Sequence, residues 1–122
     1  MNTHEFQHIR LSMIGDVVLV EVLSRDLQGP ELARELQSEL GTLVGQDWAK
    51  KMALDFGLTR YLSSTGFGAL VDFINKAHKA GKEVKLCNFD PAVRLGADII
   101  GMGKFVEILD TRNEAVKAFE AV

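Results

Sequence analysis

Three hydroxyl side chains follow one another in the middle of the chain: Ser63, Ser64 and Thr65. They come after an apolar, strand-like run at residues 52–56, and they open a long amphipathic segment. At a helix start, a hydroxyl can accept a hydrogen bond from a free backbone N–H, and the helix dipole favours an anion or a phosphorylated side chain. The run therefore indicates a helix cap, an anion site or a phosphoacceptor.

Two glycines, Gly66 and Gly68, follow the hydroxyls. They indicate either close approach of another backbone or tight packing of the helix onto a sheet. A phosphate-cradling loop fits poorly, because the Gly-x-x-x-x-Gly-Lys-Ser/Thr pattern is missing and two glycines alone do not make a dinucleotide fingerprint.

The whole chain has the composition of one globular domain spanning residues 1–122, with 47% hydrophobic and 25% charged residues. Its net charge of -3 gives no support for a nucleic-acid partner. No apolar run approaches the roughly 20 residues that cross a bilayer, so we expect no direct membrane insertion. The polar N-terminus lacks signal-peptide features, and Cys87 stands alone, which together predict a cytoplasmic protein.

Other residues that could do chemistry are isolated. His4, His8 and His78 lack metal-ligand spacing, so we expect no metal and no cofactor. Cys87 is most simply a small buried residue on a strand. Asp55, at the end of the apolar run, could cap the following turn or contact a partner.

Hydrophobic periodicity and turn residues predict alternating elements. Strands are expected over residues 6–14, 17–23, 52–56, 83–89 and 105–109. Helices are expected over about residues 30–43, 64–80 and 91–100, and from residue 112 onward. Gly15 and Asp16 predict a two-residue hairpin turn, and the continuous apolar character of residues 52–56 predicts a strand covered on both faces.

Local signals refine these helices. Asp90 before Pro91 is typical of an N-cap, and Thr111 with Glu114 fits a capping box. The apolar face of the helix over 64–80 is expected to carry the following residues: Phe67, Leu70, Val71, Ile74 and His78. The last helix is expected to bury Val116 and Phe119.

The order is two strands and a helix, followed by three strand–helix pairs (β-β-α-β-α-β-α-β-α). This order predicts an α/β fold with a mixed or mostly parallel sheet of about five strands, packed by about four helices.

The segment from Leu54 to Leu70 resembles the signature of STAS domains, the family that includes bacterial anti-sigma factor antagonists. In that family an apolar strand ends in Leu-Asp, and Asp-Ser-Ser/Thr-Gly-Leu-Gly then opens a helix. Later segments are also similar, namely residues 80–86, 91–94, 100–102 and 105–108. The resemblance implies a STAS-like fold.

The resemblance also implies roles for particular residues. Ser64 takes the position of the family's phosphorylated hydroxyl, whereas Ser63 stands where the family has Asp. A partner would contact the loop and the first turns of the helix, through Thr59, Arg60, Tyr61, Ser63, Ser64, Thr65, Gly66 and Phe67. From the residues alone, a helix-capping role for Ser63 or Ser64 remains open.

By resemblance, the partner is an anti-sigma factor that is also an ATP-dependent serine kinase, and the protein itself is not an enzyme. An alternative is a STAS module of a lipid-transport ABC system, or a signalling scaffold without phosphorylation. A remote alternative is a small serine hydrolase or ligand-binding domain that uses Ser64.

Overall fold

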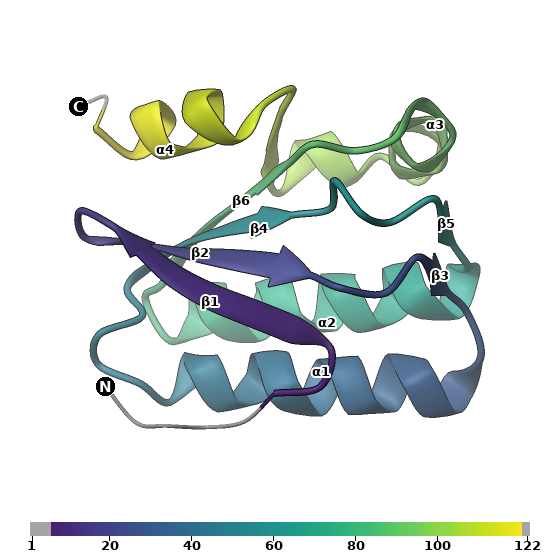
Figure 1. Cartoon of the computed structure of the whole chain (residues 1–122), viewed down its shortest axis with the longest axis horizontal. Coiled ribbons are helices and arrows are strands. Elements are labelled where there is room, and N and C mark those ends of the chain that lie inside the picture. The colour runs from purple at the N-terminus through teal and green to yellow at the C-terminus, as the bar shows by residue number, and fades with distance from the viewer. Residues whose placement is uncertain (1–5, 121–122) are drawn as a thin grey trace.

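A mixed five-stranded sheet forms the centre of the molecule in a computed structural model that describes residues 6–120. Its strands are β1 (Ile9–Ile14), β2 (Val17–Val22), β4 (Lys51–Asp55), β6 (Glu83–Cys87) and β7 (Glu107–Leu109), in the spatial order β1-β2-β4-β6-β7 (Figure 1). The β1–β2 pair is antiparallel and the other pairs are parallel. The predicted α/β fold and mixed sheet are confirmed.

The β1–β2 hairpin turns where the sequence predicts. Gly15 takes a φ of 61°, and Ile14 pairs with Val17 across the two-residue turn. Strand β1 is shorter than the expected 6–14, because residues 6–8 are not part of the sheet. The backbone N–H groups of Gln7 and His8 donate instead to the Glu39 carboxylate.

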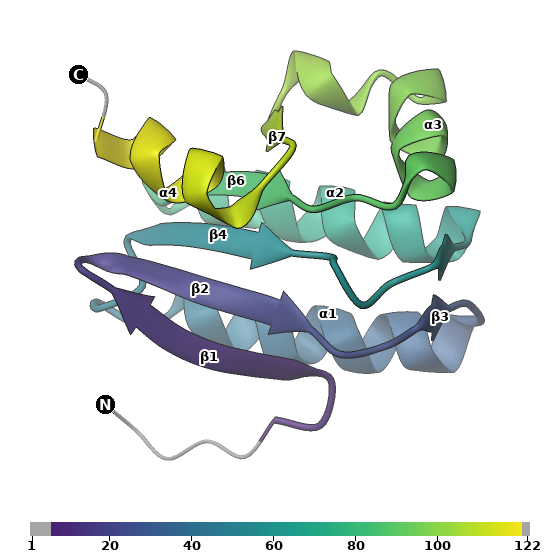
Figure 2. The same cartoon turned by 45° about the horizontal axis from the view of Figure 1, so that its top comes forward.

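The described residues form four α-helices: α1 (Pro30–Val44), α2 (Ser64–Lys79), α3 (Pro91–Ile99) and α4 (Arg112–Glu120). Helices α1 and α2 lie side by side on one face, and α4 lies on the other (Figures 1 and 2). Strand β4 is buried on both faces as predicted. Met52 and Leu54 join the larger core cluster, whereas Ala53 joins the smaller one with Phe119 of α4.

The expected apolar face of α2 is wrong at its C-terminal end. His78 is exposed and Val71 is only half-buried, whereas Phe73 and Ala77 are buried. A helix turns about 100° per residue, so the stripe that begins at Leu70 continues through 73, 74 and 77 instead of 78. On α4, similarly, Ala115 is buried and Val116 is half-buried.

Two short strands were not expected from the sequence. Strands β3 (Asp26–Leu27) and β5 (Tyr61–Leu62) pair in parallel as a separate ribbon beside the start of α2. The last strand is shorter than expected, because a 3₁₀ helix, η1 (Met102–Lys104), precedes it and β7 begins only at Glu107.

The predicted caps of α3 and α4 form in the structure. The Asp90 side chain accepts a hydrogen bond from Ala92 N at 3.1 Å. The hydroxyl of Thr111 accepts one from Glu114 N at 3.1 Å and donates to the Glu114 carboxylate at 3.0 Å. The glutamate therefore meets the capping hydroxyl instead of the backbone N–H of Thr111.

Candidate functional site

Ser63 is the N-cap of α2. Its backbone is extended, with φ -74° and ψ 168°, and its Oγ accepts a hydrogen bond from Gly66 N at 3.2 Å. Its own N–H donates to Leu27 O at 3.0 Å, which ties the cap to the β3–β5 ribbon. This geometry confirms a capping role for Ser63 and leaves Ser64 outside the cap.

Ser64 is the first residue of α2, and its side chain is exposed. Within residues 6–120, no hydrogen bond engages its hydroxyl. Thr65 beside it is also exposed. The first turn of α2 holds no acidic side chain, so negative charge added there meets the positive end of the helix dipole without repulsion from that turn.

The two glycines of the motif have different roles. A Cβ at Gly66 would lie 2.6 Å from Leu62 Cδ1 and 3.0 Å from Leu27 O, so α2 approaches the β3–β5 ribbon too closely for any side chain there. A Cβ at Gly68 would meet no atom within 4 Å. Tight packing therefore accounts for Gly66 but not for Gly68.

The expected partner surface is only partly exposed. Arg60 and Tyr61 are exposed, with Tyr61 at 49%. Thr59, in contrast, is fully buried, and its hydroxyl donates to Ser24 O at 2.8 Å. Gly66 is buried as well. Thr59 and Gly66 are therefore buried in the free protein, and contact of this loop with a partner stays a prediction.

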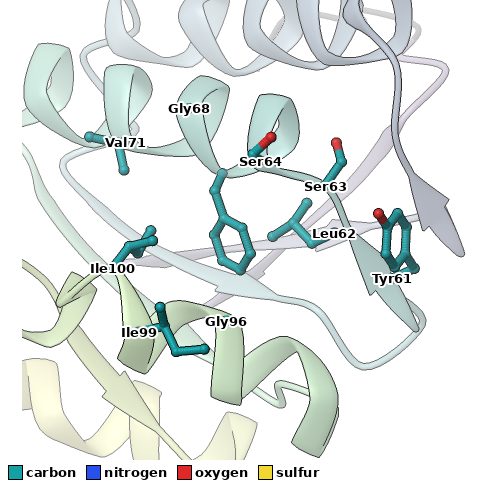
Figure 3. Close-up of a pocket in the computed structure, with 10 residues that line it drawn as sticks. Tyr61, Leu62, Ser63, Ser64, Gly68, Val71, Gly96, Ile99 and Ile100 are labelled. Carbon is teal, nitrogen blue, oxygen red and sulfur yellow. The ribbon is translucent and has the colours of Figure 1, made fainter.

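An apolar groove of about 540 Å³ opens next to Ser64, between α2 and the end of α3. Figure 3 shows Val71 and Gly68 on one wall and Ile99 and Ile100 on the other, with both serines at one end. Ile99 is 76% exposed and Ile100 is 49% exposed. The lining residues are Tyr61, Leu62, Ser63, Ser64, Phe67, Gly68, Val71, Gly96, Ile99 and Ile100.

Sequence reasoning missed the α3 wall of this groove. A signal was present, because Leu95 and Ile99 are one helical turn apart and do not share the face of Val93 and Ala97, which the structure buries. Large apolar side chains on the solvent face of a short helix are typical of an interaction surface.

Asp55 sits at the carboxyl end of β4 and is only 1% exposed. Its Oδ1 accepts from Gly57 N at 2.8 Å, which confirms the turn-capping interpretation. Asn88 Nδ2 lies 3.1 Å from both of its oxygens, and Arg112 Nε donates to Oδ2 at 2.8 Å. The hydrogen bond to Asp55 raises the pKa of the Arg112 guanidinium above its usual value.

Cys87 is buried on β6, as expected for a small apolar residue. Burial, reinforced by the nearby Asp55 carboxylate, raises the pKa of its thiol to about 12. The thiol is therefore protonated at neutral pH and is a poor nucleophile.

Neither of the two described histidines lines the groove beside Ser64. His8 contacts the Glu35 carboxylate at 2.8 Å, and His78 is 14 residues further along α2, a rise of about 21 Å. His4 lies outside the described residues. In the part of the chain that the structure describes, no cluster of metal-ligating side chains is found.

None of the helices in residues 6–120 combines the length and apolar character that crossing a membrane requires.

The parallel order of the strands after the first hairpin and the helices on both faces define an α/β fold with a mixed sheet. The STAS domain model matches residues 19–115, and the chain belongs to the STAS domain family. No curated protein sequence shows significant similarity to the chain.

Solved structures share this fold at low sequence identity. An anti-sigma factor antagonist from Mycobacterium paratuberculosis is 20% identical, with a TM-score of 0.79 and 92% of each chain covered. The phosphorylated form of the Bacillus cell fate determinant SpoIIAA is 16% identical, with a TM-score of 0.67. The match covers 91% of this chain and 98% of the SpoIIAA chain. The murine anion transporter Slc26a9 is 18% identical with a TM-score of 0.78; the match covers 91% of this chain but 19% of the transporter.

Proposed function

We propose that this STAS domain is an anti-sigma factor antagonist that binds an anti-sigma factor with serine kinase activity and is switched by phosphorylation of Ser64. The observation that carries the proposal is the position of Ser64. Its hydroxyl is exposed on the first residue of α2, next to an apolar groove and one residue after the side chain that caps the helix. A partner that covers the groove would also cover Ser64.

Phosphorylation at this position would act on the partner and not on the fold. A phosphoserine adds about -1.5 to -2 charges, and the N-terminus of a helix favours that charge. Because Ser63 and not Ser64 caps α2, the modification leaves the cap bond to Gly66 intact. The added charge would lie beside the apolar groove, and a bound partner would have to remove water from that charge. We therefore expect release of the partner without unfolding of the domain.

The first experiment incubates the protein with an anti-sigma factor kinase and ATP and maps the product by mass spectrometry. We expect phosphate on Ser64, its loss in Ser64→Ala and its retention in the matched variant Thr65→Ala, which removes the adjacent exposed hydroxyl. Phosphate on another residue, with Ser64→Ala fully competent, would refute the acceptor assignment.

Ser63 stands where the family has Asp, and this substitution can be tested directly. Ser63→Asp keeps a good N-cap and restores the carboxylate, whereas Ser63→Asn keeps the cap without charge. We expect Ser63→Asp to be phosphorylated faster than the wild type and Ser63→Asn to match it. Equal rates in all three proteins would show that the residue before Ser64 has no part in presenting it.

The presence of Ser63 where the family has Asp favours a second candidate. This candidate is a STAS module that works without phosphorylation in a transport or signalling assembly. The match to part of the anion transporter Slc26a9 supports this candidate, because the same fold occurs there within a transport protein. Affinity purification from the native cell separates the two candidates. Recovery of transporter subunits without an anti-sigma factor would favour the module.

A further inference from the structure

The groove beside Ser64 continues into a second hollow. This second hollow, of about 170 Å³, lies between β5 and the first turns of α3. The two hollows share four lining residues, namely Tyr61, Leu62, Phe67 and Gly96. We refer to both together as the α2–α3 groove, which extends from Arg60 at one end to Ile100 at the other.

The apolar surface of α3 reaches beyond this groove. Leu95 is 62% exposed and lies one helical turn before Ile99, yet it lines neither hollow. A small molecule in the groove would therefore leave Leu95 in water. An apolar surface that continues past the groove fits another polypeptide better than a small molecule.

The groove offers few groups that could pair with a peptide backbone. Its walls are α2 and α3, whose backbone groups beyond the first turn pair within each helix, and its one strand, β5, has two residues. An extended segment would leave most of its own N–H and C=O groups buried without partners. A helix pairs these groups internally, and Ser64, Gly68 and Val71 form a ridge of α2 against which a third helix can pack.

Gly68 is the residue of the groove that the free protein does not explain. A Cβ there would meet no atom within 4 Å, and glycine inside a helix is less favourable than alanine. Gly96, on the other wall, is explained, because a Cβ there would lie 3.0 Å from the ring of Phe67. On the α2 wall, Gly68 leaves space in which the backbone of an occupant can approach the helix (Figure 3).

The ends of the groove carry cations that this chain does not neutralise. Arg60 lines one end and donates to a backbone carbonyl at 2.9 Å. At the other end Lys104 lies over Gly101, just past α3. Among the described residues, neither cation forms an ion pair, whereas the nearby Asp98 pairs with Arg94 at 3.2 Å. An occupant with acidic residues at its ends is therefore complementary in charge.

We propose that the α2–α3 groove binds one amphipathic helix of the partner, with its apolar face toward Gly68 and acidic residues at its ends, near Arg60 and Lys104. This proposal rests on the proposed function, because the partner is the anti-sigma factor named there. It adds the form and the charge of the segment that the partner inserts. Phosphate on Ser64 would lie at the Tyr61 end of the groove and repel the acidic residues there (Figure 3).

Titration calorimetry with an anti-sigma factor kinase and a non-hydrolysable ATP analogue tests the groove without phosphorylation. Gly68→Leu fills the open space and should weaken binding by about tenfold or more, as overpacking does. Gly41→Leu is the matched control, because Gly41 lies in α1, outside the groove, and a Cβ there also meets no atom within 4 Å. It should bind like the wild type.

The outcomes separate this proposal from the proposed function. Gly68→Leu that binds as tightly as the wild type would overturn the groove proposal and leave the phosphorylation of Ser64 standing. A wild-type chain that does not bind the kinase at all would overturn both.

Charge reversal tests the acidic ends of the helix. Lys104→Glu should weaken binding several-fold, and high salt should reduce the difference from the wild type. Lys117→Glu makes the same change on exposed α4 and should have no effect. Tighter binding by Lys104→Glu, or equal effects of the two variants, would contradict the acidic ends.

Photo-cross-linking tests the form of the occupant. A benzophenone attached to Ile99→Cys, at the rim of the groove, should mark partner residues three or four positions apart in one segment, as the face of a helix presents them. The native Cys87 is buried and does not take the label. Marked residues two positions apart would indicate an extended segment, and cross-links only between copies of this chain would indicate a second copy. Either result would overturn the proposal.

Discussion

Arg112, on the first turn of α4, places both Nε and Nη2 2.8 Å from Oδ2 of the buried Asp55. The two residues are 57 positions apart in the sequence. Because Asp55 also holds Gly57 N and Asn88, this pair fastens the last helix to the loop that leads toward Ser64.

Removal of Arg112 should therefore destabilise the fold strongly. In Arg112→Ala the Asp55 carboxylate stays buried and loses the cation that pairs with it, and we expect a loss of about 3 kcal/mol in the free energy of unfolding. Urea denaturation measures it. Arg10→Ala is the matched control, because Arg10 pairs with Glu21 at the surface and should cost at most about 1 kcal/mol. Equal losses in the two variants would show that the buried Asp55–Arg112 pair contributes no more to stability than the surface pair of Arg10 and Glu21.

The two motif glycines should respond oppositely to alanine. Gly66→Ala forces a Cβ against Leu62 and the Leu27 carbonyl, and we expect a cost of about 1–3 kcal/mol. Gly68→Ala has open space and a helical backbone, so it should stabilise by about 0.5–1 kcal/mol. Thermal unfolding of both variants is the measurement. A stabilised Gly66→Ala would contradict the close packing of α2 on the β3–β5 ribbon.

The cap of α2 should be measurable without any partner. Ser63→Ala loses the hydrogen bond to Gly66 N, and we expect a cost of about 1 kcal/mol. Ser64→Ala should change stability by less than about 0.5 kcal/mol, because its hydroxyl is exposed and outside the cap. Chemical denaturation compares the two. A larger loss of stability in Ser64→Ala than in Ser63→Ala would contradict the assignment of Ser63 as the cap.

Cys87 should make stability fall at alkaline pH. Its thiol has a pKa of about 12 in the folded protein and about 8.5 when unfolded, so the unfolded state releases the proton first. The stabilisation is complete below about pH 8.5 and is lost as the pH rises toward 12, by about 1.4 kcal/mol per unit in between. The free energy of unfolding of Cys87→Ala should lack this component of the slope.

Thiol labelling provides a separate check on Cys87. At pH 8 the folded protein should react slowly with a thiol reagent, and the urea-unfolded protein should react at the rate of a free cysteine. Fast labelling of the folded protein would contradict both the burial of the thiol and its raised pKa.

Local patterns in the sequence determined most of the elements. The start of α2, the hairpin at Gly15 and the cap at Asp90 each depend on neighbouring residues, and all three form where they were expected. The exposed position of Ser64 follows from its place at the start of α2. Short β3 and β5 were not predictable, because two-residue strands have no periodicity and form only when Asp26 and Tyr61 meet in space.

Tertiary structure alone decided which residues surround Ser64. Ile99 approaches α2 only because α3 packs back across the end of the sheet, and the buried Thr59 hydroxyl finds its acceptor, Ser24 O, only in the folded chain. Asp55 and Arg112 likewise meet only once α4 lies on the sheet. Hydrophobic periodicity reports one element's own faces, whereas these contacts depend on how separate elements pack. The sequence therefore determined where the serine stands on its helix, and the packing of α3 decided what lies beside it.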